Sequence, residues 1–189
     1  MKQAKVLTPT ELKRLLAVVD SGRYATRNRL AVMLSFNAGL RVGEIASLNI
    51  GDVVGKDGLV RDELRLKPHQ TKGGQHRTVF VNRLLKREIS AYIAGLQRLP
   101  AADRPLLVTQ KGRAFTANVL CQLFGELYRK AGIDGASSHS GRRSFITTLA
   151  YKGVSAKVIM ELAGHKNLAT TQRYIDVTDE MKRQAVEML

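Results

Sequence analysis

The chain has 189 residues, of which 31 are Lys or Arg and 16 are Asp or Glu, so its formal net charge at pH 7 is +15. The length suits one domain with a sizeable core, and a hydrophobic content of 44% is ordinary for a soluble globular protein. A single cysteine, Cys121, excludes an internal disulfide and a multi-cysteine zinc site. No apolar run approaches the roughly 20 residues that a membrane-spanning helix needs, so we expect a cytoplasmic protein with no membrane segment. The positive charge favours a polyanionic partner but does not separate DNA, RNA and an anionic membrane.

The N-terminal part of the sequence reads as helices with clear boundaries. Thr8-Pro9-Thr10-Glu11 predicts a capping box that opens a helix ending near Ser21-Gly22. A second helix is expected from about Ala25 to Ala38, stopped by Gly39, and a short one from Val42 to Leu48.

Residues 52–81 have a different texture, with short apolar or alternating runs between turns. Leu59–Leu66 and Arg77–Val81 are expected to be strands of a small antiparallel sheet. Gly73-Gly74 favours a tight turn between them, with Lys72 at the start of that hairpin turn.

The remainder of the chain is expected to be mostly helical. The predicted elements are a helix from Asn82 to about Leu96, a short strand at Leu106–Val108, a helix from a cap at Thr116 to Gly132, short helices at Ser140–Lys152, Ser155–Ala163 and Ala169–Ile175, and a tail helix from about Asp179. No linker is long enough to separate two domains. The sequence therefore predicts a single domain, residues 1–189, that is mainly α with a small antiparallel β-sheet (α+β).

Four motifs carry the chemically interesting side chains. They are Ala38-Gly39-Leu40-Arg41-Val42-Gly43-Glu44-Ile45, Thr71-Lys72-Gly73-Gly74, Ser138-His139-Ser140-Gly141-Arg142-Arg143-Ser144-Phe145, and Leu162-Ala163-Gly164-His165 followed nine residues later by Tyr174. With these motifs in this order, the chain resembles the tyrosine recombinases, the family of lambda integrase and the Xer proteins. The resemblance covers essentially the whole chain. It implies the catalytic-domain fold that these enzymes share with type IB topoisomerases.

The residue types fit attack on a phosphodiester. Charge on the non-bridging oxygens must be neutralised, and guanidinium groups do this well because they hydrogen-bond phosphate bidentately, which makes Arg41 and Arg142 the candidates. Tyr174 would be the nucleophile, but a phenol with a pKa near 10 needs help at neutral pH. His139 is the candidate that accepts its proton or orders the phosphate.

Two further groups complete the expected catalytic set. Lys72 is the candidate acid that protonates the departing 5′-oxygen, and His165 would add a hydrogen bond in the transition state. The resemblance implies that Tyr174 forms a 3′-phosphotyrosyl bond, which a 5′-hydroxyl then reverses without ATP, a metal or another cofactor. The sequence contains no Asp/Glu cluster of the kind that two-metal nucleases use. These residues predict a site-specific recombinase of double-stranded DNA, serving integration, excision, inversion or resolution.

Taken singly, each of these residues also has a purely structural explanation. Arg41 could cap a helix through the helix dipole, and Lys72 could be a solvated turn residue. His139 and His165 could be helix-end groups, and Tyr174 an amphipathic surface ring. Such explanations do not account for the order and spacing of the whole set.

Other side chains are expected to support the site or contact DNA. Glu44 lies one turn after Arg41 and could orient its guanidinium or form a surface ion pair. Arg143 stands where many relatives carry a second His, and it could contact phosphate or face solvent. The candidate DNA-binding residues are Arg143, Arg173, Lys166 and His76.

The tail at about residues 178–189 would form a helix too short to be stable alone, so it must dock. It could dock on its own core or on a neighbouring protomer; we favour the neighbour and expect a tetramer on DNA, associated with the nucleoid. Most relatives carry an N-terminal DNA-clamping domain that residues 1–189 do not contain.

Two other functions remain open from the sequence. Ser140–Lys152 and Ser155–Ala163 could form a non-catalytic helix-turn-helix DNA-binding module. The chain could also be a relaxing topoisomerase of the type IB class.

Overall fold

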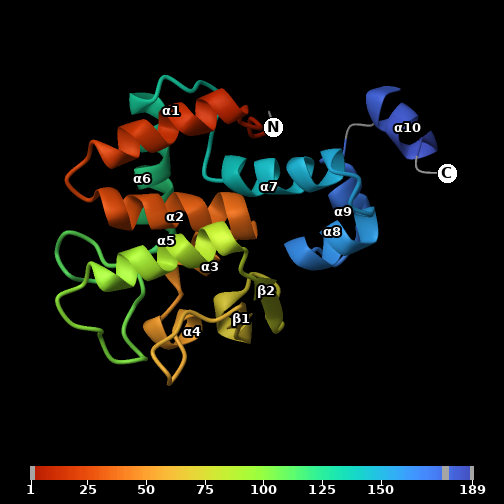
Figure 1. The fold of residues 1–189 in the computed structure, drawn as a ribbon. Coiled ribbons are helices and arrows are strands. Elements are labelled where there is room, and N and C mark those ends of the chain that lie inside the picture. Colours follow the sequence, from red (N-terminus) through yellow and green to blue (C-terminus); the bar gives the residue numbers. More distant parts are fainter. Residues whose placement is uncertain (1–2, 176–178, 188–189) are drawn as a thin grey trace.

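The computed structural model describes residues 3–175 and 179–187 (Figure 1). Its elements are α1 (Pro9–Asp20), α2 (Ala25–Ala38), α3 (Val42–Ala46), α4 (Ile50–Val53), β1 (Glu63–Leu66), a 3₁₀ helix η1 (Pro68–Gln70), β2 (Arg77–Phe80), α5 (Arg83–Ala94), α6 (Ala117–Lys130), α7 (Ser140–Tyr151), α8 (Ala156–Ala163), α9 (Leu168–Gln172) and α10 (Asp179–Val186). None of the helices in this part of the chain is long and apolar enough to span a bilayer.

Helix α2 is the centre of the molecule. It packs against α1 and α5 and also against α7, and its buried residues lie all around its circumference (Figure 1). A helix that is buried on every side belongs in the middle of a core. This central position matters because the residues that follow α2 enter the site described below.

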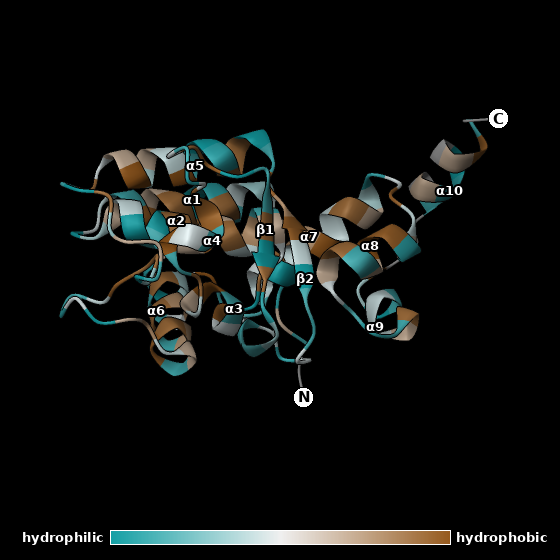
Figure 2. Cartoon of the chain, turned by 90° about the horizontal axis from the view of Figure 1, so that it is seen from below, coloured by the Kyte–Doolittle hydropathy of each residue, from teal (hydrophilic) through white to brown (hydrophobic). Residues whose placement is uncertain are grey.

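The buried apolar residues form two clusters. The large one gathers side chains from Leu7 to Ile133 and joins α1 to α6 and the sheet. The small one consists of Ile146 and Ala150 of α7 and Ile159 and Ala163 of α8. Figure 2 shows the helices α7 to α10 as a group beside the body of the domain.

The fold class expected from the sequence is confirmed: the domain is mostly helical with a two-stranded antiparallel sheet. The capping box is present, with the Thr8 side chain accepting from the Glu11 backbone N–H and the Glu11 carboxylate accepting from the Thr8 backbone. Helix α2 has the expected bounds and stops at Gly39, whose φ of +60° suits a residue without Cβ. Thr116 caps α6 by accepting from the Val119 N–H.

The predicted tight hairpin turn at Gly73-Gly74 is wrong. Strands β1 and β2 pair antiparallel with Leu66 opposite Arg77, and residues 67–76 connect them. The connection contains η1, where the buried Gln70 side chain donates to the Ser47 carbonyl at 2.8 Å and to Asp52 at 2.7 Å. These bonds attach the loop to the body, so its path is longer than a tight turn.

Other local predictions also need correction. Residues 106–108 are not a strand: Leu106 donates its N–H to the Leu48 carbonyl, and only isolated bridges flank this segment. Helix α4 was not expected, α3 ends at Ala46 rather than Leu48, and α9 covers Leu168–Gln172 rather than Ala169–Ile175. In the tail, α10 is described, whereas residues 178, 188 and 189 lie outside the described residues. Cys121 is partly buried against the large cluster.

Candidate active site

Arg142 lies where α7 meets the ends of two other helices. Its side chain is buried, and it donates one hydrogen bond to the Gly39 carbonyl at 2.7 Å and another to the Ala163 carbonyl. Gly141 permits this approach, because a Cβ there would lie 2.3 Å from Ser35 Oγ on α2. Gly141 thus lets α7 pack close to α2, and Arg142 points its guanidinium at the C-terminal end of α2.

The Gly164-His165 motif ends helix α8. The Gly164 N–H donates to the Glu161 carbonyl at 2.9 Å, and the His165 N–H donates to the Met160 carbonyl at 3.0 Å. With Gly164 at a φ of +64°, this is a Schellman motif, which satisfies two of the last helical carbonyls. The turn fixes the direction in which the chain carries His165 away from the helix.

Guanidinium groups satisfy the other two carbonyls at the end of α8. Arg142 bonds the Ala163 carbonyl, and Arg77 bonds the Leu162 carbonyl at 2.7 Å. Cations are favoured at a helix C-terminus, where the dipole leaves partial negative charge. The end of α8 is therefore attached both to α7 and to the sheet.

Glu44 holds two guanidinium groups together. Its carboxylate accepts from Arg41 Nη1 at 2.8 Å and from Arg77 Nη1 at 2.7 Å, and its side chain is only 2% exposed. Burial by itself raises the pKa of the Glu44 carboxyl, but Arg77 and Arg41 outweigh this effect and hold that pKa below its usual value. The ion pair is therefore a buried one and not a surface pair.

Arg77 is a residue of this site that the sequence reading missed. The signal was present, because alternation along β2 places Arg77 on the same face as the buried Val79. An arginine on the inward face of a strand needs a partner, and only the folded chain identifies Glu44 and Leu162 as the partners.

His165 and Tyr174 lie beside each other. Their rings stack with centroids 5.8 Å apart and an angle of 23° between the planes. The buried Thr171 connects them, since its hydroxyl pairs with His165 Nδ1 at 2.9 Å and its carbonyl accepts from the Tyr174 N–H at 2.9 Å. The sequence analysis assigned no role to Thr171.

The accumulated positive charge has two consequences for ionisation. Burial, with the charges of Arg41 and Arg77 added, lowers the pKa of Arg142 to about 9. Burial and the charge of Arg142 lower the pKa of His165 to about 4, so its imidazole is neutral at pH 7. A neutral imidazole whose Nδ1 is paired with a hydroxyl retains its other nitrogen for a ligand.

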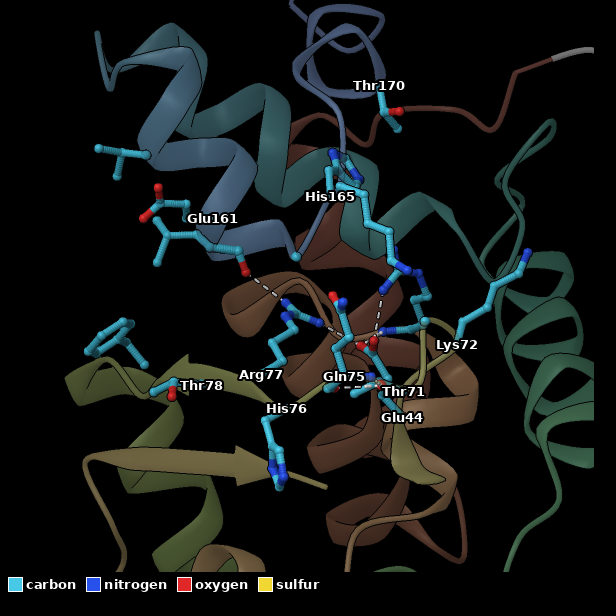
Figure 3. Close-up of a pocket in the computed structure, with 17 residues that line it drawn as sticks. Glu44, Thr71, Lys72, Gln75, His76, Arg77, Thr78, Glu161, His165 and Thr170 are labelled. Atoms are coloured by element: carbon cyan, nitrogen blue, oxygen red, sulfur yellow. Dashed lines mark hydrogen bonds and ion pairs between the residues drawn. The ribbon is translucent and has the colours of Figure 1, made fainter. Parts of the chain in front are cut away.

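A cleft of about 800 Å³ opens beside Arg41, Arg77 and His165, whereas Arg142 and Tyr174 do not line it (Figure 3). In Figure 3, Arg77 and Glu44 point toward one another and His165 lies above them. The cleft is lined by β2, by the β1–β2 loop and by the end of α8, through residues that include Arg41, Lys72, His76, Arg77, His165 and Lys166.

Two of the expected catalytic residues are exposed and form no side-chain hydrogen bond with this cluster among the described residues. Lys72 lines the cleft, but it is exposed and its side chain extends away from Glu44 and Arg77 (Figure 3). His139 is exposed at the residue before α7, and its ring forms no hydrogen bond with another described residue.

The candidate DNA-binding residues fall into different surroundings. Arg143 is half-buried, with its guanidinium carbon 5.6 Å from the centre of the Tyr174 ring. Lys166 lies across Gly73 and lines the cleft. His76 lines the cleft but points away from His165 (Figure 3), and Arg173 is exposed directly after α9.

Comparison with known proteins agrees with this arrangement of motifs. The model of the phage integrase family matches residues 5–181. The chain belongs to this family. It is 34% identical over 187 residues to the tyrosine recombinase XerA of Pyrococcus furiosus, covering 97% of this chain and 61% of the relative. It is 39% identical over 189 residues to the XerA of Thermococcus kodakarensis, covering 97% of this chain and 62% of the relative.

Solved structures of tyrosine recombinases share the fold. A crystal structure of XerA recombinase has a TM-score of 0.77 at 24% identity, covering 100% of this chain and 64% of that one. A post-cleavage complex of XerH bound to a palindromic difH substrate has a TM-score of 0.74 at 24% identity, covering 96% of this chain and 51% of that one. The chain spans about three fifths of the length of the curated relatives that it matches.

Family membership confirms the resemblance to tyrosine recombinases, and it does not favour a helix-turn-helix module or a topoisomerase. The geometry of α8 also argues against its being a recognition helix. Its one basic residue, Lys157, is within 3.5 Å of Glu161, and the carbonyls at its end are occupied by Arg77 and Arg142.

Proposed function

We propose that this chain acts as the catalytic domain of a site-specific DNA recombinase, which cuts and rejoins double-stranded DNA through a 3′-phosphotyrosyl intermediate. The observation that carries the proposal is that Arg142 bonds the Gly39 and Ala163 carbonyls, which lie two residues before Arg41 and His165. The His165 ring in turn stacks on Tyr174. The curated relatives are named tyrosine recombinases, and the XerH structure of similar fold is described as bound to its DNA substrate.

The reaction follows from the chemistry of these groups. The oxygen of Tyr174 attacks the phosphorus, a P–O bond to tyrosine forms, and the bond to the 5′-oxygen breaks. Arg41 and Arg142 neutralise the non-bridging oxygens, where negative charge builds up in the transition state. His165, held neutral and oriented by Thr171, donates a hydrogen bond to the same oxygens. Attack by a 5′-hydroxyl on the phosphotyrosine reverses these bond changes.

Two protons must also move. His139 accepts the proton that the Tyr174 phenol loses, and Lys72 donates a proton to the departing 5′-oxygen. Both side chains are exposed, and that of Lys72 extends away from Glu44 and Arg77 (Figure 3). The role of Lys72 therefore requires that bound DNA or a loop movement brings its ammonium group to the phosphate.

DNA is the proposed partner, in a cytoplasmic and nucleoid-associated setting. The net charge of +15 supports binding to a polyanion. Lys166 and His76 border the cleft, and Arg143 and Arg173 lie next to the catalytic residues in sequence. We assign these four side chains to contacts with the DNA around the cleavage site. The described residues would work together as one catalytic domain.

The tail supports assembly into a tetramer on DNA. Helix α10 extends away from the body in Figure 1, and Val186 on it is 67% exposed. A helix of 8 residues is marginal in water without a docking surface. We propose that α10 docks on a neighbouring protomer and so couples one active site to the next.

A covalent-trapping experiment tests the function. DNA with a nick close to the cleavage site releases a short fragment after attack, so rejoining is prevented and the protein–DNA adduct accumulates. The wild-type chain should form the adduct, and Tyr174→Phe should bind DNA without forming it. Tyr24→Phe, which also loses one phenol, is the matched control and should react like the wild type. An adduct formed by Tyr174→Phe would show that the nucleophile is another residue, and no adduct with any DNA would leave only a binding function.

A further inference from the structure

Arg77 bridges two parts of the site through its guanidinium group. Nη1 donates to the buried Glu44 carboxylate and Nη2 donates to the Leu162 carbonyl, both at 2.7 Å. Its side chain is only 8% exposed. Glu44 is the same carboxylate that holds Arg41, and Leu162 lies three residues before His165. The guanidinium of Arg77 therefore connects the carboxylate that holds Arg41 to the end of α8, which leads to His165.

The glycine turn at Gly164 also fixes the position of the Arg77 side chain. A Cβ on Gly164 would lie 2.6 Å from Arg77 Cδ, so the arginine side chain runs directly under the glycine turn. Because Gly164 also has a φ of +64°, a larger residue there would both strain the backbone and displace Arg77. The turn that carries His165 and the arginine on β2 thus fit against each other.

Stability alone does not explain a charged group at this position. Arg77 Nε is buried and forms no hydrogen bond within the described part of the chain, and an unsatisfied buried donor costs free energy. A buried ion pair is often no more stabilising than apolar residues of similar volume. An arginine here is better explained by the site it borders than by packing.

We propose that Arg77 is a positioning residue of the reaction: it sets the distance between the Glu44–Arg41 pair on the body and the His165 turn at the end of α8. The inference rests on the proposed recombinase function, since it concerns the same phosphate-binding groups. Arg77 follows the β1–β2 loop that carries Lys72, so the sheet, the body and α8 are joined at this one side chain.

The charge of Arg77 leaves a signature on His165 that can be measured without DNA. It is one of three guanidinium groups, with Arg142 and Arg41, that add to burial in lowering the pKa of His165. A neutral residue at position 77 should therefore raise that pKa, whereas a lysine should largely preserve it.

The experiment compares Arg77→Gln, Arg77→Lys and a control, Arg29→Gln, in the full chain. Arg29 also donates two hydrogen bonds to a glutamate, Glu88, but it joins α2 to α5 away from the cleft. Three quantities are measured: the single-turnover rate of adduct formation at saturating nicked DNA, the Kd for that DNA, and the His165 pKa from NMR titration.

Arg77→Gln should slow adduct formation by roughly 10²-fold, as expected for misplacement of catalytic groups by about 1 Å, and change the Kd far less. It should also raise the His165 pKa above about 4. Arg77→Lys should keep that pKa but still slow adduct formation, because one ammonium cannot span both acceptors. Arg29→Gln should change neither the rate nor the pKa.

Several results would overturn the inference. One is a wild-type rate at saturating DNA in Arg77→Gln, or in Arg77→Lys if the glutamine variant does not fold. Another is a rate loss in Arg29→Gln equal to that in Arg77→Gln, which would indicate a general effect of stability. Failure of the wild-type chain to form an adduct would instead refute the proposed function. In that case, an unchanged His165 pKa in folded Arg77→Gln would refute the inference as well.

Discussion

The body of the domain and its C-terminal segment are held together in different ways. In the body, apolar side chains from α1 to α6 and the sheet form one continuous core. In the segment formed by α7 to α10, the buried apolar cluster is limited to Ile146, Ala150, Ile159 and Ala163. The attachment of this segment to the body depends heavily on polar bonds, such as those of Arg142 to Gly39 and of Arg77 to Leu162.

The comparison matters because the candidate active site lies across the junction. Arg41 and Glu44 belong to the body, whereas His165 and Tyr174 belong to the segment. A small core opens locally at a lower free energy than a large one. Chemistry that depends on both parts is therefore sensitive to the few polar bonds that join them.

The largest effect is expected at Arg142, which lies at the junction and which we propose to bind the phosphate. Arg142→Gln should lower the single-turnover rate of adduct formation by about 10²–10³-fold, the usual loss for one transition-state donor. DNA affinity should fall much less. Arg129→Gln on α6, which removes one exposed charge, is the control and should react normally. Equal losses in rate and affinity would make Arg142 only an anchor for DNA.

A pair of core substitutions separates the two regions directly. Leu34 and Ile159 are both fully buried, the first in the body and the second in the segment. Leu34→Ala should lower the global free energy of unfolding by about 2–5 kcal/mol. Ile159→Ala should instead speed hydrogen exchange in α8 while exchange in α2 stays close to that of the wild type. If both variants speed exchange in α2 equally, the domain unfolds as one unit and the proposed contrast is wrong.

The lowered pKa of His165 predicts a pH effect on stability. His165 titrates at about 4 in the folded chain, against about 6.5 in the unfolded chain. Between these values the unfolded state binds more protons, so the free energy of unfolding is highest above about pH 6.5 and falls as the pH drops toward 4. His165→Gln should flatten this dependence in denaturant titrations, whereas His76→Gln, at an exposed position, should retain it. A slope unaffected by His165→Gln would show that another group titrates.

The smallest effect is expected at Arg143, whose guanidinium lies over the Tyr174 ring. A cation–π contact contributes about 0.5–1 kcal/mol at exposed sites, so Arg143→Gln should slow adduct formation only a few-fold. If Arg143 also contacts a phosphate, as proposed above, the slope of log K against log salt should become shallower by about 0.9 in Arg143→Gln. Measuring the rate of adduct formation and the salt slope together decides which contact this arginine makes. Arg143→Lys is the control that keeps the positive charge.

Much of the local structure was predictable because it depends on residues close in sequence. The capping box of Thr8 and Glu11, the stop at Gly39 and the cap at Thr116 each involve contacts within about one helical turn. The motif order around Arg41, Arg142 and Tyr174 likewise identified the family from the sequence alone.

The sequence could not decide which distant segments come into contact. Arg77 and Leu162 are 85 residues apart, and Arg142 and Gly39 are 103 apart, so no local pattern relates them. The loop that carries Lys72 was misjudged for the same reason, since Gln70 attaches it to Ser47 on the body. Residue types and spacing identified the family and the side chains that we propose to carry the chemistry. Tertiary packing decided which of them meet, because a buried guanidinium takes whichever carbonyls and carboxylates the folded chain brings within its reach.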